Sequence, residues 1–433
     1  MDALLRLPII DSPAMWVVYG GAVVLALVLL ARPARDGWWV RASLGLVGGA
    51  ITAVVLFLVA NVVEAFGTDL PLAVAFWAVA CFAAVGLAIV SFPRARAWRR
   101  VIAGVAVIWF LVSGVVGVNA YYGLNPTLGS LLGVVVDTPI DVPGSGGAAA
   151  APDQPIYTTW TAPNDLATVG KQGTENIPGT ESGFVARPAG IYLPPAALAS
   201  DAPALPLVIM MMGYPGNPDV SFIAGVLDQY AADHAGLAPI VIVADQIGGT
   251  GSDQDPACAD SAAYGAAETY ITKDVAAWAR ANLRIIDDPR YWVIAGYSNG
   301  GGCAIKYGAA YPGEFSNIID VSGEEFPGSE DVSGVLETIY GGDQAAFDAS
   351  KPINIMASAP PGAYANTTAV FTAGSEDPGF IAASQTVAAA AEKAGMSVTS
   401  YVVPGADHLV SAITGGLDEG FAVLYPVLGL SAP

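Results

Sequence analysis

The segment Gly296-Tyr297-Ser298-Asn299-Gly300 decides the fold prediction for this chain of 433 residues. It follows directly on the apolar run Tyr291-Trp292-Val293-Ile294-Ala295 and precedes a stretch of small residues with helical composition. A serine between two glycines at a strand-to-helix junction is the layout of a nucleophile elbow, in which a sharp turn lifts the hydroxyl above the sheet. Because the chain holds 50 glycines, chance supplies such a pentapeptide roughly 0.3 times. The surrounding sequence therefore has to support the interpretation.

From about Gly183 onward, short β-rich runs alternate with alanine-rich helical stretches. This alternation predicts an α/β domain, with a mostly parallel, doubly wound sheet covered by helices. The expected strands are 189–193, 205–211, 239–244, 291–295, 317–321, 369–373 and 398–403, and the expected helices are 267–282, 301–311 and 380–395. Catalytic groups in such sheets gather at the carboxyl ends of the strands. Candidate residues are therefore expected at that edge.

A serine hydroxyl is a weak nucleophile unless a base removes its proton, and histidine is the usual base. The chain contains only two histidines. His408 comes just after the expected strand 398–403, at the same edge as Ser298. His234 belongs to a helix that precedes a strand, which places it at the opposite edge. We expect His408 to be the base and His234 to be structural.

The imidazole of a triad needs a carboxylate that fixes its tautomer. Asp377 follows the expected strand 369–373 in a turn at the carboxyl edge. The alternatives at this edge are its neighbour Glu376, and then Asp320 and Glu324 after the strand 317–321. Asp377 is preferred because the chain order Ser298, Asp377, His408 is that of α/β-hydrolases.

An acyl-transfer site also needs two backbone N–H groups to hold the oxyanion, one of them on the residue after the nucleophile. That residue is Asn299. The expected strand 205–211 runs into a Gly/Pro-rich turn, and we assign the second donor to the Tyr214 amide there. Met212 and Gly213 are close alternatives.

The composition requires part of the chain to lie in a membrane. Hydrophobic residues make up 54% of the sequence and the mean hydropathy is +0.54, which is too apolar for one soluble globule. Four apolar runs, 14–31, 42–63, 70–90 and 101–122, each approach the roughly 20 residues that an α-helix needs to cross a bilayer. We therefore expect an all-α domain of four transmembrane helices.

Charge separates this region from the rest of the chain. Residues 1–122 hold eight of the 17 basic and five of the 38 acidic residues, so the remainder has a net charge near −24. A surface this acidic excludes nucleic acid as a partner.

The loop arginines orient the helices, because Lys and Arg are retained on the cytoplasmic side. They follow the first and third runs, whereas acidic residues follow the second; the residues concerned are Arg32, Arg35, Arg41, Arg94, Arg96, Arg99 and Arg100, against Glu64 and Asp69. This pattern predicts a multi-pass protein of the plasma membrane with both termini and the acidic domain on the extracytoplasmic side. A cleaved signal peptide is not expected, because no basic cluster precedes the first run.

These observations divide the chain into a transmembrane domain (1–122), a Gly/Ala/Pro-rich linker (123–155) and an extracytoplasmic α/β domain (156–433). Cys258 and Cys303 both belong to the outer domain, where a disulfide and two buried thiols are equally consistent with the sequence. We see no metal-binding cluster and no cofactor motif, so neither a metal nor a cofactor is expected.

Three parts of the sequence together resemble the esterase D branch of the α/β-hydrolases, which includes the secreted mycolyltransferases of the mycolic-acid cell envelope. They are the segment 187–195, the segment Glu268-Thr269-Tyr270-Ile271 ahead of the elbow, and the late histidine. The resemblance covers somewhat more than half of the chain. It implies acyl transfer through a serine ester, to water or to a sugar hydroxyl. It also implies Ser298 as nucleophile, His408 as base and a carboxylate near Glu376 and Asp377 as the group that orients the base.

The expected function is thus that of a membrane-anchored serine esterase or acyltransferase that acts on lipid or cell-envelope esters. Four alternatives remain: a mycolyltransferase proper, a broad carboxylesterase or aminoacyl-lipid hydrolase, a non-catalytic envelope interaction protein, and a transporter or scaffold. The bilayer and an ester substrate are the expected partners, and protein partners stay open. A transporter is disfavoured because the apolar runs contain almost no ionisable residue.

Overall fold

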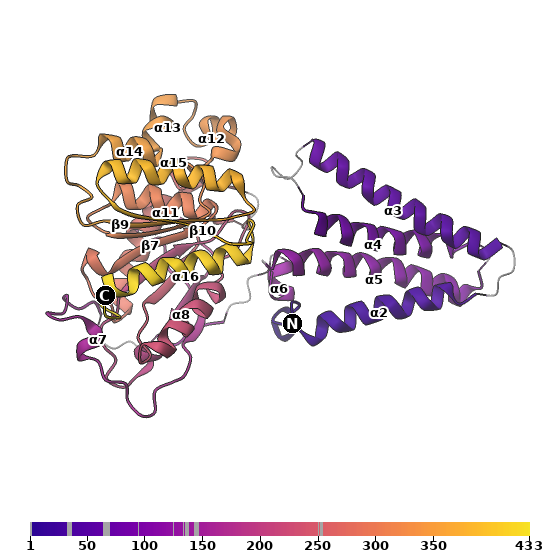
Figure 1. Cartoon of the computed structure of the whole chain (residues 1–433), viewed down its shortest axis with the longest axis horizontal. Helices are drawn as coiled ribbons and strands as arrows, with labels where there is room; N and C mark the ends of the chain where they lie inside the picture. The colour runs from indigo at the N-terminus through magenta and orange to yellow at the C-terminus, as the bar shows by residue number, and fades with distance from the viewer. Residues whose placement is uncertain are drawn as a thin grey trace. The chain divides into compact units, whose positions relative to one another are not determined.

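The computed structural model describes residues 2–32, 37–63, 70–93, 95–123, 125–132, 134, 138–142, 147–249, 251 and 254–433. The chain divides into two compact units, Met1–Val136 and Asp137–Pro433 (Figure 1). Several residues named in the topology and linker predictions lie outside the described residues, namely Arg35, Glu64, Asp69, Arg94 and the linker segment 143–146.

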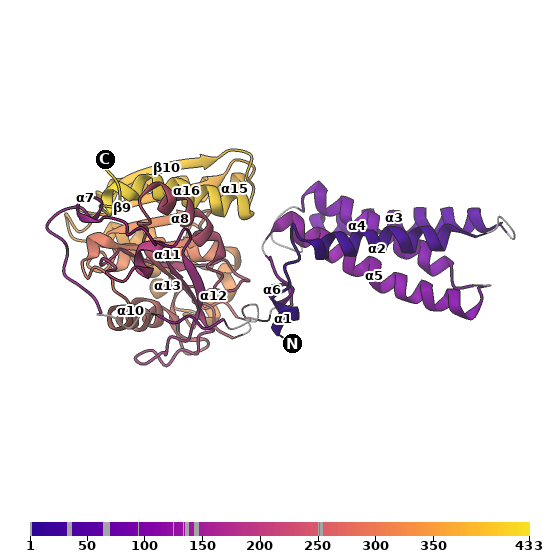
Figure 2. The same cartoon turned by 90° about the horizontal axis from the view of Figure 1, so that it is seen from below.

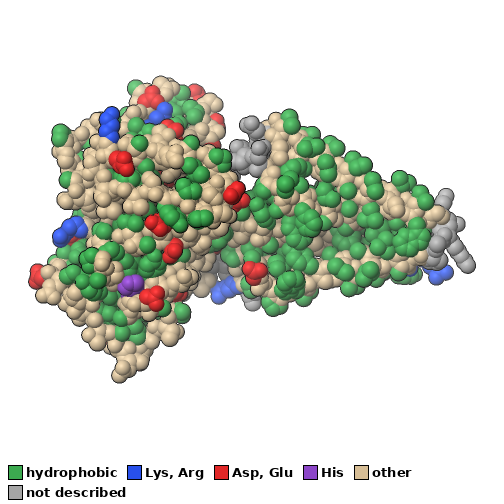
Figure 3. All heavy atoms as spheres, viewed as in Figure 1, with side chains coloured by type: hydrophobic (Ala, Val, Ile, Leu, Met, Phe, Trp, Pro, Cys, Tyr) green, Lys and Arg blue, Asp and Glu red, His purple; other side chains and the backbone are tan. Residues whose placement is uncertain are grey.

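The first unit is built from four long apolar helices. They are α2 (Pro13–Leu30), α3 (Trp38–Val62), α4 (Leu72–Val90) and α5 (Ala97–Tyr122), accompanied by the short helices α1 (Asp2–Leu5) and α6 (Leu128–Leu131). All four are long and apolar enough to cross a membrane. Most of their apolar side chains face outward, and Figure 3 shows hydrophobic atoms over most of the visible surface of this unit. The predicted all-α domain of four such helices is confirmed, and membrane association follows from it.

Small residues let these helices approach closely, as is common between helices in a bilayer. A Cβ added to Gly45 would lie 2.7 Å from the carbonyl oxygen of Gly86, and one added to Gly49 would overlap the carbonyl of Phe82. The α3 and α4 backbones are therefore in direct contact.

The second unit contains an eight-stranded sheet with the order β1-β2-β4-β3-β7-β8-β9-β10. Its strands are β1 (Lys171–Glu175), β2 (Ala189–Leu193), β3 (Leu207–Met211), β4 (Ile240–Ala244), β7 (Trp292–Tyr297), β8 (Asn317–Val321), β9 (Thr368–Gly374) and β10 (Ser397–Val403). Strands β4 to β10 in this order pair in parallel, whereas β1 and β2 pair antiparallel with their neighbours. The seven strands predicted from the sequence are all present. The edge strand β1 and the small hairpin β5 (Asp260–Ser261) and β6 (Gly265–Ala266) were not predicted.

Helices cover both faces of this sheet, as Figures 1 and 2 show. One face carries α11 (Asn299–Ala310), α14 (Pro352–Ser358) and α15 (Pro378–Ala394), and the other carries α8 (Ser221–Asp233) and α16 (Val410–Val427). The short helices α12 (Val332–Thr338) and α13 (Gln344–Ser350) lie in the insertion between β8 and β9. The predicted helix 267–282 is observed as α9 (Ala267–Thr269), a π-helical turn (Tyr270–Val275) and α10 (Ala276–Asn282). The predicted doubly wound α/β class is confirmed.

The segment predicted as a linker, 123–155, makes backbone hydrogen bonds in both units. Ile9 donates to the carbonyl oxygen of Pro126 at 2.9 Å in the first unit. Ile140 donates to the carbonyl oxygen of Thr174 at 3.2 Å in the second. The boundary between the two compact units falls within this segment, between Val136 and Asp137, and the predicted bounds of the linker stay a prediction.

Candidate active site

Ser298 occupies the sharp turn between β7 and α11. Its backbone angles are φ 56° and ψ −121°, a combination that costs a non-glycine residue about 1–3 kcal/mol. The flanking glycines make the turn possible: a Cβ added to Gly296 would overlap the carbonyl of Gly300, and one added to Gly300 would overlap the carbonyl of Met211. The turn therefore has the geometry of a nucleophile elbow.

The structure brings Ser298, His408 and Asp377 together in a chain of hydrogen bonds. The Ser298 Oγ lies 2.9 Å from His408 Nε2, and His408 Nδ1 lies 2.9 Å from Asp377 Oδ2. The imidazole is also packed between two aromatic side chains, because its ring centroid lies 4.1 Å from that of Phe380 and 5.0 Å from that of Tyr297. The Tyr297 hydroxyl donates to the His408 backbone carbonyl oxygen at 3.0 Å. These contacts fix the ring so that one nitrogen faces the serine and the other faces the carboxylate.

The alternative acids lie elsewhere. Glu376 is exposed, and its carboxylate contacts the hydroxyl of Ser375 at 3.4 Å. Asp320 and Glu324 are buried beneath the first turn of α11. Within the part of the chain that the structure describes, none of the three makes a hydrogen bond to His408.

Burial changes the acidity of these two inner carboxyls. It raises the pKa of Asp320 to about 7, against the smaller opposing effect of a hydrogen bond from the Gly323 amide. Burial, followed by the nearby charge of Asp255, raises the pKa of Glu324 to about 8. Both groups therefore hold a proton to a much higher pH than an exposed carboxyl would.

The segments that carry the two predicted oxyanion donors both lie beside the serine. Asn299 is the first residue of α11, where the backbone N–H has no partner within the helix. The turn after β3 approaches from the other side, since a Cβ added to Gly213 would come within 3.3 Å of Ser298 Cβ. The assignment of the second donor to Tyr214 rather than Met212 or Gly213 stays a prediction. The carbonyl oxygen of Met212 is already engaged, because it accepts a hydrogen bond from Gln246 Nε2 at 2.6 Å.

A polar network around the Asn299 side chain was missed in the sequence. Gln246 Nε2 donates to Asn299 Oδ1 at 3.2 Å, and Asn299 Nδ2 donates to Asp255 at 3.3 Å and to Glu324 Oε1 at 3.5 Å. Gln246, Asn299 and Glu324 are buried. These residues come from three separate segments, namely the loop between β4 and β5, the start of α11 and the loop after β8, so no local spacing in the sequence signals the network.

Cys258 and Cys303 form a disulfide with their Cα atoms 5.3 Å apart. The bond joins the loop that contains Asp255 to the middle of α11. The sequence had left a disulfide and free thiols equally open.

His234 lies at the end of α8, away from Ser298. Its Nδ1 is 2.7 Å from the carbonyl oxygen of Tyr230, and its ring packs against Tyr425 with centroids 4.8 Å apart. The expectation that His234 is structural stays a prediction.

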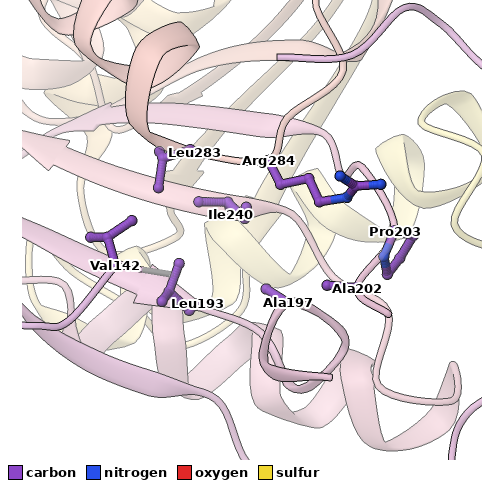
Figure 4. Close-up of a pocket in the computed structure, with 8 residues that line it drawn as sticks. All are labelled: Val142, Leu193, Ala197, Ala202, Pro203, Ile240, Leu283 and Arg284. Carbon is purple, nitrogen blue, oxygen red and sulfur yellow. The ribbon is translucent and has the colours of Figure 1, made fainter. Parts of the chain in front are cut away.

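A small pocket in the second unit lies at the opposite edge of the sheet, where β4 begins and β2 ends (Figure 4). It is lined by Val142, Leu193, Ala197, Ala202, Pro203, Ile240, Leu283 and Arg284. Its volume of about 20 Å³ is room for one water molecule. The pocket is therefore too small for a substrate. Across the described residues, no cluster of three His, Cys, Asp or Glu side chains could hold a metal ion.

The second unit matches a family of known proteins. The family described as putative esterase matches residues 186–399, which include Ser298 and Asp377. An uncharacterized protein of Corynebacterium glutamicum is 31% identical over 412 residues, which cover 92% of this chain and 92% of that protein.

Solved structures share the fold of the second unit at low sequence identity. A ferulic acid esterase has a TM-score of 0.50 and 15% identity, over 61% of this chain and 100% of the esterase. The S-formylglutathione hydrolase from Agrobacterium tumefaciens has a TM-score of 0.49 and 18% identity, over 61% and 98%. The chain belongs to the esterase family of α/β-hydrolases, with this domain preceded by four helices that are long and apolar enough to span a membrane.

Proposed function

We propose that this esterase-family hydrolase uses Ser298 as nucleophile, His408 as base and Asp377 as the orienting acid. The proposal makes it a membrane-anchored serine esterase or acyltransferase that acts outside the cytoplasm on lipid or cell-envelope esters. The observation that carries it is the continuous hydrogen-bond chain from Ser298 Oγ through both imidazole nitrogens to Asp377 Oδ2.

In the first half of the reaction, His408 Nε2 takes the proton of the Ser298 hydroxyl while the oxygen attacks the ester carbonyl carbon. The carboxylate of Asp377 accepts the Nδ1–H and stabilises the imidazolium that forms. The backbone amides of Asn299 and Tyr214 donate hydrogen bonds to the carbonyl oxygen and stabilise the negative charge that develops on it. When the tetrahedral intermediate collapses, His408 returns the proton to the leaving alcohol, and an acyl-enzyme remains on Ser298.

In the second half, water or an acceptor hydroxyl attacks the carbonyl carbon of the acyl-enzyme and gives its proton to His408. The bond between the acyl group and Ser298 Oγ then breaks, and His408 returns the proton to the serine. The choice between water and a hydroxyl acceptor distinguishes an esterase from an acyltransferase. A transfer of mycolyl groups between trehalose esters and envelope acceptors is the narrower form of the proposal, and it rests on the resemblance to the mycolyltransferases.

The proposed side of the membrane depends on which end of the helix bundle carries the arginines. Arg32 Nη2 donates to the carbonyl oxygen of Ser91 at 2.8 Å, and Arg99 Nη2 donates to that of Ala31 at 3.0 Å. The loops after α2 and α4 therefore share one end, and the positive-inside rule assigns that end to the cytoplasm. Because α5 runs away from this end, the hydrolase unit follows on the extracytoplasmic side.

The membrane unit also guides the choice of substrate. The Corynebacterium glutamicum relative aligns with 92% of this chain, so the match extends from the hydrolase unit into the helices. A hydrolase joined to the bilayer meets amphiphilic esters at a high effective concentration. Lipid and envelope esters are therefore the proposed substrate class.

Labelling with a fluorophosphonate probe tests the nucleophile directly. The full-length protein is incubated in native membranes as wild type, as Ser298→Ala and as Ser375→Ala. Ser375 is the control because it is an exposed serine at the same edge whose hydroxyl accepts from the Gly405 amide at 2.8 Å. We expect labelling of the wild type and of Ser375→Ala but not of Ser298→Ala. An unlabelled wild type would instead favour a non-catalytic interaction protein.

Two further measurements test the substrate and the side of the membrane. Product analysis of a lipid ester with and without trehalose separates hydrolysis from transfer to a sugar hydroxyl. Protease added to intact cells should digest the hydrolase unit, and its complete protection would contradict the proposed orientation.

A further inference from the structure

Gln246 lies two residues beyond the end of β4, between the two segments that carry the proposed oxyanion donors. Its side chain is buried, with a relative exposure of 3%. It donates from Nε2 to the Met212 carbonyl oxygen at 2.6 Å and to Asn299 Oδ1 at 3.2 Å. One amide group thus joins the turn after β3 to the first residue of α11.

The chemistry of the partners fixes the orientation of both amide groups. A backbone carbonyl oxygen can only accept, so the atom of Gln246 beside Met212 must be the NH₂ group. The Asn299 atom beside the same NH₂ group must then be its oxygen, which turns its own NH₂ group toward Asp255 and Glu324. The result is a directed chain in which each amide uses its NH₂ group as donor.

A second network holds the loop from which Gln246 projects. Asp245 is fully buried and forms an ion pair with Arg187 at 2.6 Å. It also accepts from the backbone amides of Ile247 at 3.2 Å and Gly248 at 3.1 Å. Arg187 in turn donates to the carbonyl oxygen of Gly216 at 2.8 Å, at the far end of the turn that begins at Met212. The turn is therefore held by hydrogen bonds at two carbonyl oxygens, that of Gly216 through Arg187 and that of Met212 through Gln246. The Met212 contact is the one nearer to Ser298.

The hydrogen bond from Gln246 to the Met212 carbonyl oxygen fixes the orientation of the Met212–Gly213 peptide plane. In a trans peptide the C=O and N–H groups point in opposite directions, so directing the Met212 carbonyl at Gln246 also sets the direction of the Gly213 N–H. The Tyr214 amide follows one peptide later, and its position depends on this plane. Electrostatic stabilisation of an oxyanion requires donors that are already in place before the charge develops.

We propose that Gln246 is a positioning residue of the oxyanion hole. It fixes the Met212–Gly213 peptide relative to Asn299 by donating one hydrogen bond to the Met212 carbonyl oxygen and one to Asn299 Oδ1. The inference rests on the proposed serine-hydrolase function and extends it to a residue that does not touch the reacting atoms.

The test compares Gln246→Met, which keeps the length of the side chain but has no donor, with Gln254→Met as matched control. Gln254 belongs to the same loop region and donates from Nε2 to the Ile247 carbonyl oxygen at 2.8 Å. The full-length proteins are assayed in detergent micelles for kcat and KM on a p-nitrophenyl ester. A trifluoromethyl ketone of the same acyl length serves as the probe of the oxyanion hole. Its carbonyl carbon bonds to Ser298 Oγ, the hydroxyl proton moves to His408, and the carbonyl electron pair becomes an oxyanion.

Removal of one oxyanion donor costs about 10²–10³ in kcat, and loss of a group that positions a donor should cost less. We expect Gln246→Met to lower kcat/KM by about 10- to 100-fold with KM nearly unchanged, and to weaken the ketone by the same factor. Gln254→Met should stay within about twofold of wild type on both measurements.

A merely structural residue would lower the melting temperature and the yield of active enzyme without a matched loss of ketone affinity. The proposal is overturned if Gln246→Met binds the ketone as tightly as wild type, or if Gln254→Met loses as much. Should Gln246→Met not fold, Gln246→Asn decides by the same criterion, because its shorter amide cannot reach both acceptors. A wild type that reacts with neither ester nor ketone would refute the proposed function itself.

Discussion

Replacement of Asp377 by asparagine isolates the part that its carboxylate plays in orienting His408. The wild-type carboxylate accepts the Nδ1–H at 2.9 Å, which leaves Nε2 free to accept the proton of Ser298. The asparagine amide can instead donate to Nδ1. The ring proton then moves to Nε2, and the imidazole presents a donor to the serine where the reaction needs an acceptor.

The expected loss is large in rate and small in stability. A carboxylate-to-amide change at this position of a serine triad lowers kcat by about 10⁴, which corresponds to about 5 kcal/mol in the barrier. Asp377 also caps α15, since its Oδ1 accepts from the Phe380 amide at 3.5 Å. Asparagine is about as good an N-cap as aspartate, so the melting temperature should change little.

The assay is steady-state hydrolysis of a p-nitrophenyl ester by the full-length protein, with melting temperatures measured on the same samples. Glu376→Gln is the matched control, because the same chemical change is made one residue away on an exposed side chain. Its kcat should stay within about twofold of wild type. The reasoning is refuted if Asp377→Asn keeps more than about a tenth of the wild-type kcat, or if Glu376→Gln loses as much.

Three further predictions concern the stability of the hydrolase unit. Gly296→Ala places a methyl group against the Gly300 carbonyl and should abolish probe labelling and lower the melting temperature, whereas Gly313→Ala, with nothing within 4 Å, should change neither. Burial and the charge of Asp255 raise the pKa of Glu324 from 4.5 to about 8, so between these pH values the folded chain keeps a proton that the unfolded chain has released. Stability should therefore fall as the pH rises through this window, and Glu324→Gln should raise the melting temperature at pH 8 but not at pH 4.5. If the melting temperatures of Glu324→Gln and wild type differ by the same amount at pH 8 and at pH 4.5, this reasoning is contradicted. The Cys258–Cys303 bond spans a sequence separation of 45, so serine at both positions should cost about 4 kcal/mol on unfolding in denaturant, and a loss below about 1 kcal/mol would argue against a stabilising bond.

The parallel strands β3, β4, β7, β8 and β9 were predictable because they are buried on both faces and read as short apolar runs. β1 escaped prediction since its sequence, Lys-Gln-Gly-Thr-Glu, has neither the apolar run nor the alternation typical of a strand. It is a strand because its backbone pairs with β2 along its whole length. Pairing, rather than local preference, determines its structure.

The helix α16 was not predicted from the sequence because its local composition also disfavours the observed structure. Glycine weakens helices in isolation, and this helix contains Gly415, Gly416 and Gly420. Contact with the sheet requires all three: a Cβ on Gly416 would overlap the hydroxyl oxygen of Thr372, one on Gly415 would lie 2.5 Å from Val403 Cγ1, and one on Gly420 would lie 2.8 Å from Ile319 Cδ1. Residues that look unfavourable in the sequence therefore permit close packing in the fold.

The predicted triad residues were accessible to sequence reasoning because each follows a recognisable strand. Topology then carries the strand ends to one edge of the sheet. Gln246 also follows a predicted strand, 239–244, but a glutamine there has no catalytic chemistry that would single it out, and Asp255 does not directly follow a predicted strand. Their contacts with Asn299 span 53 and 44 residues of chain, and only the folded structure defines them.

Two of the six non-glycine residues with positive φ in the described part of the chain, and two carboxyls with raised pKa, lie at or just beyond the carboxyl ends of two neighbouring strands. Ser298 after β7 and Ser322 after β8 have φ values of 56° and 48°, and each costs about 1–3 kcal/mol at a non-glycine residue. Asp320 and Glu324, at the end of β8 and just beyond it, are carboxyls whose pKa values burial raises to about 7 and about 8. Real proteins break local rules mainly at functional sites, where the surrounding structure compensates. The occurrence of these costs around the turn of Ser298 therefore favours function at this edge of the sheet, beside the hydrogen bonds that link Ser298, His408 and Asp377.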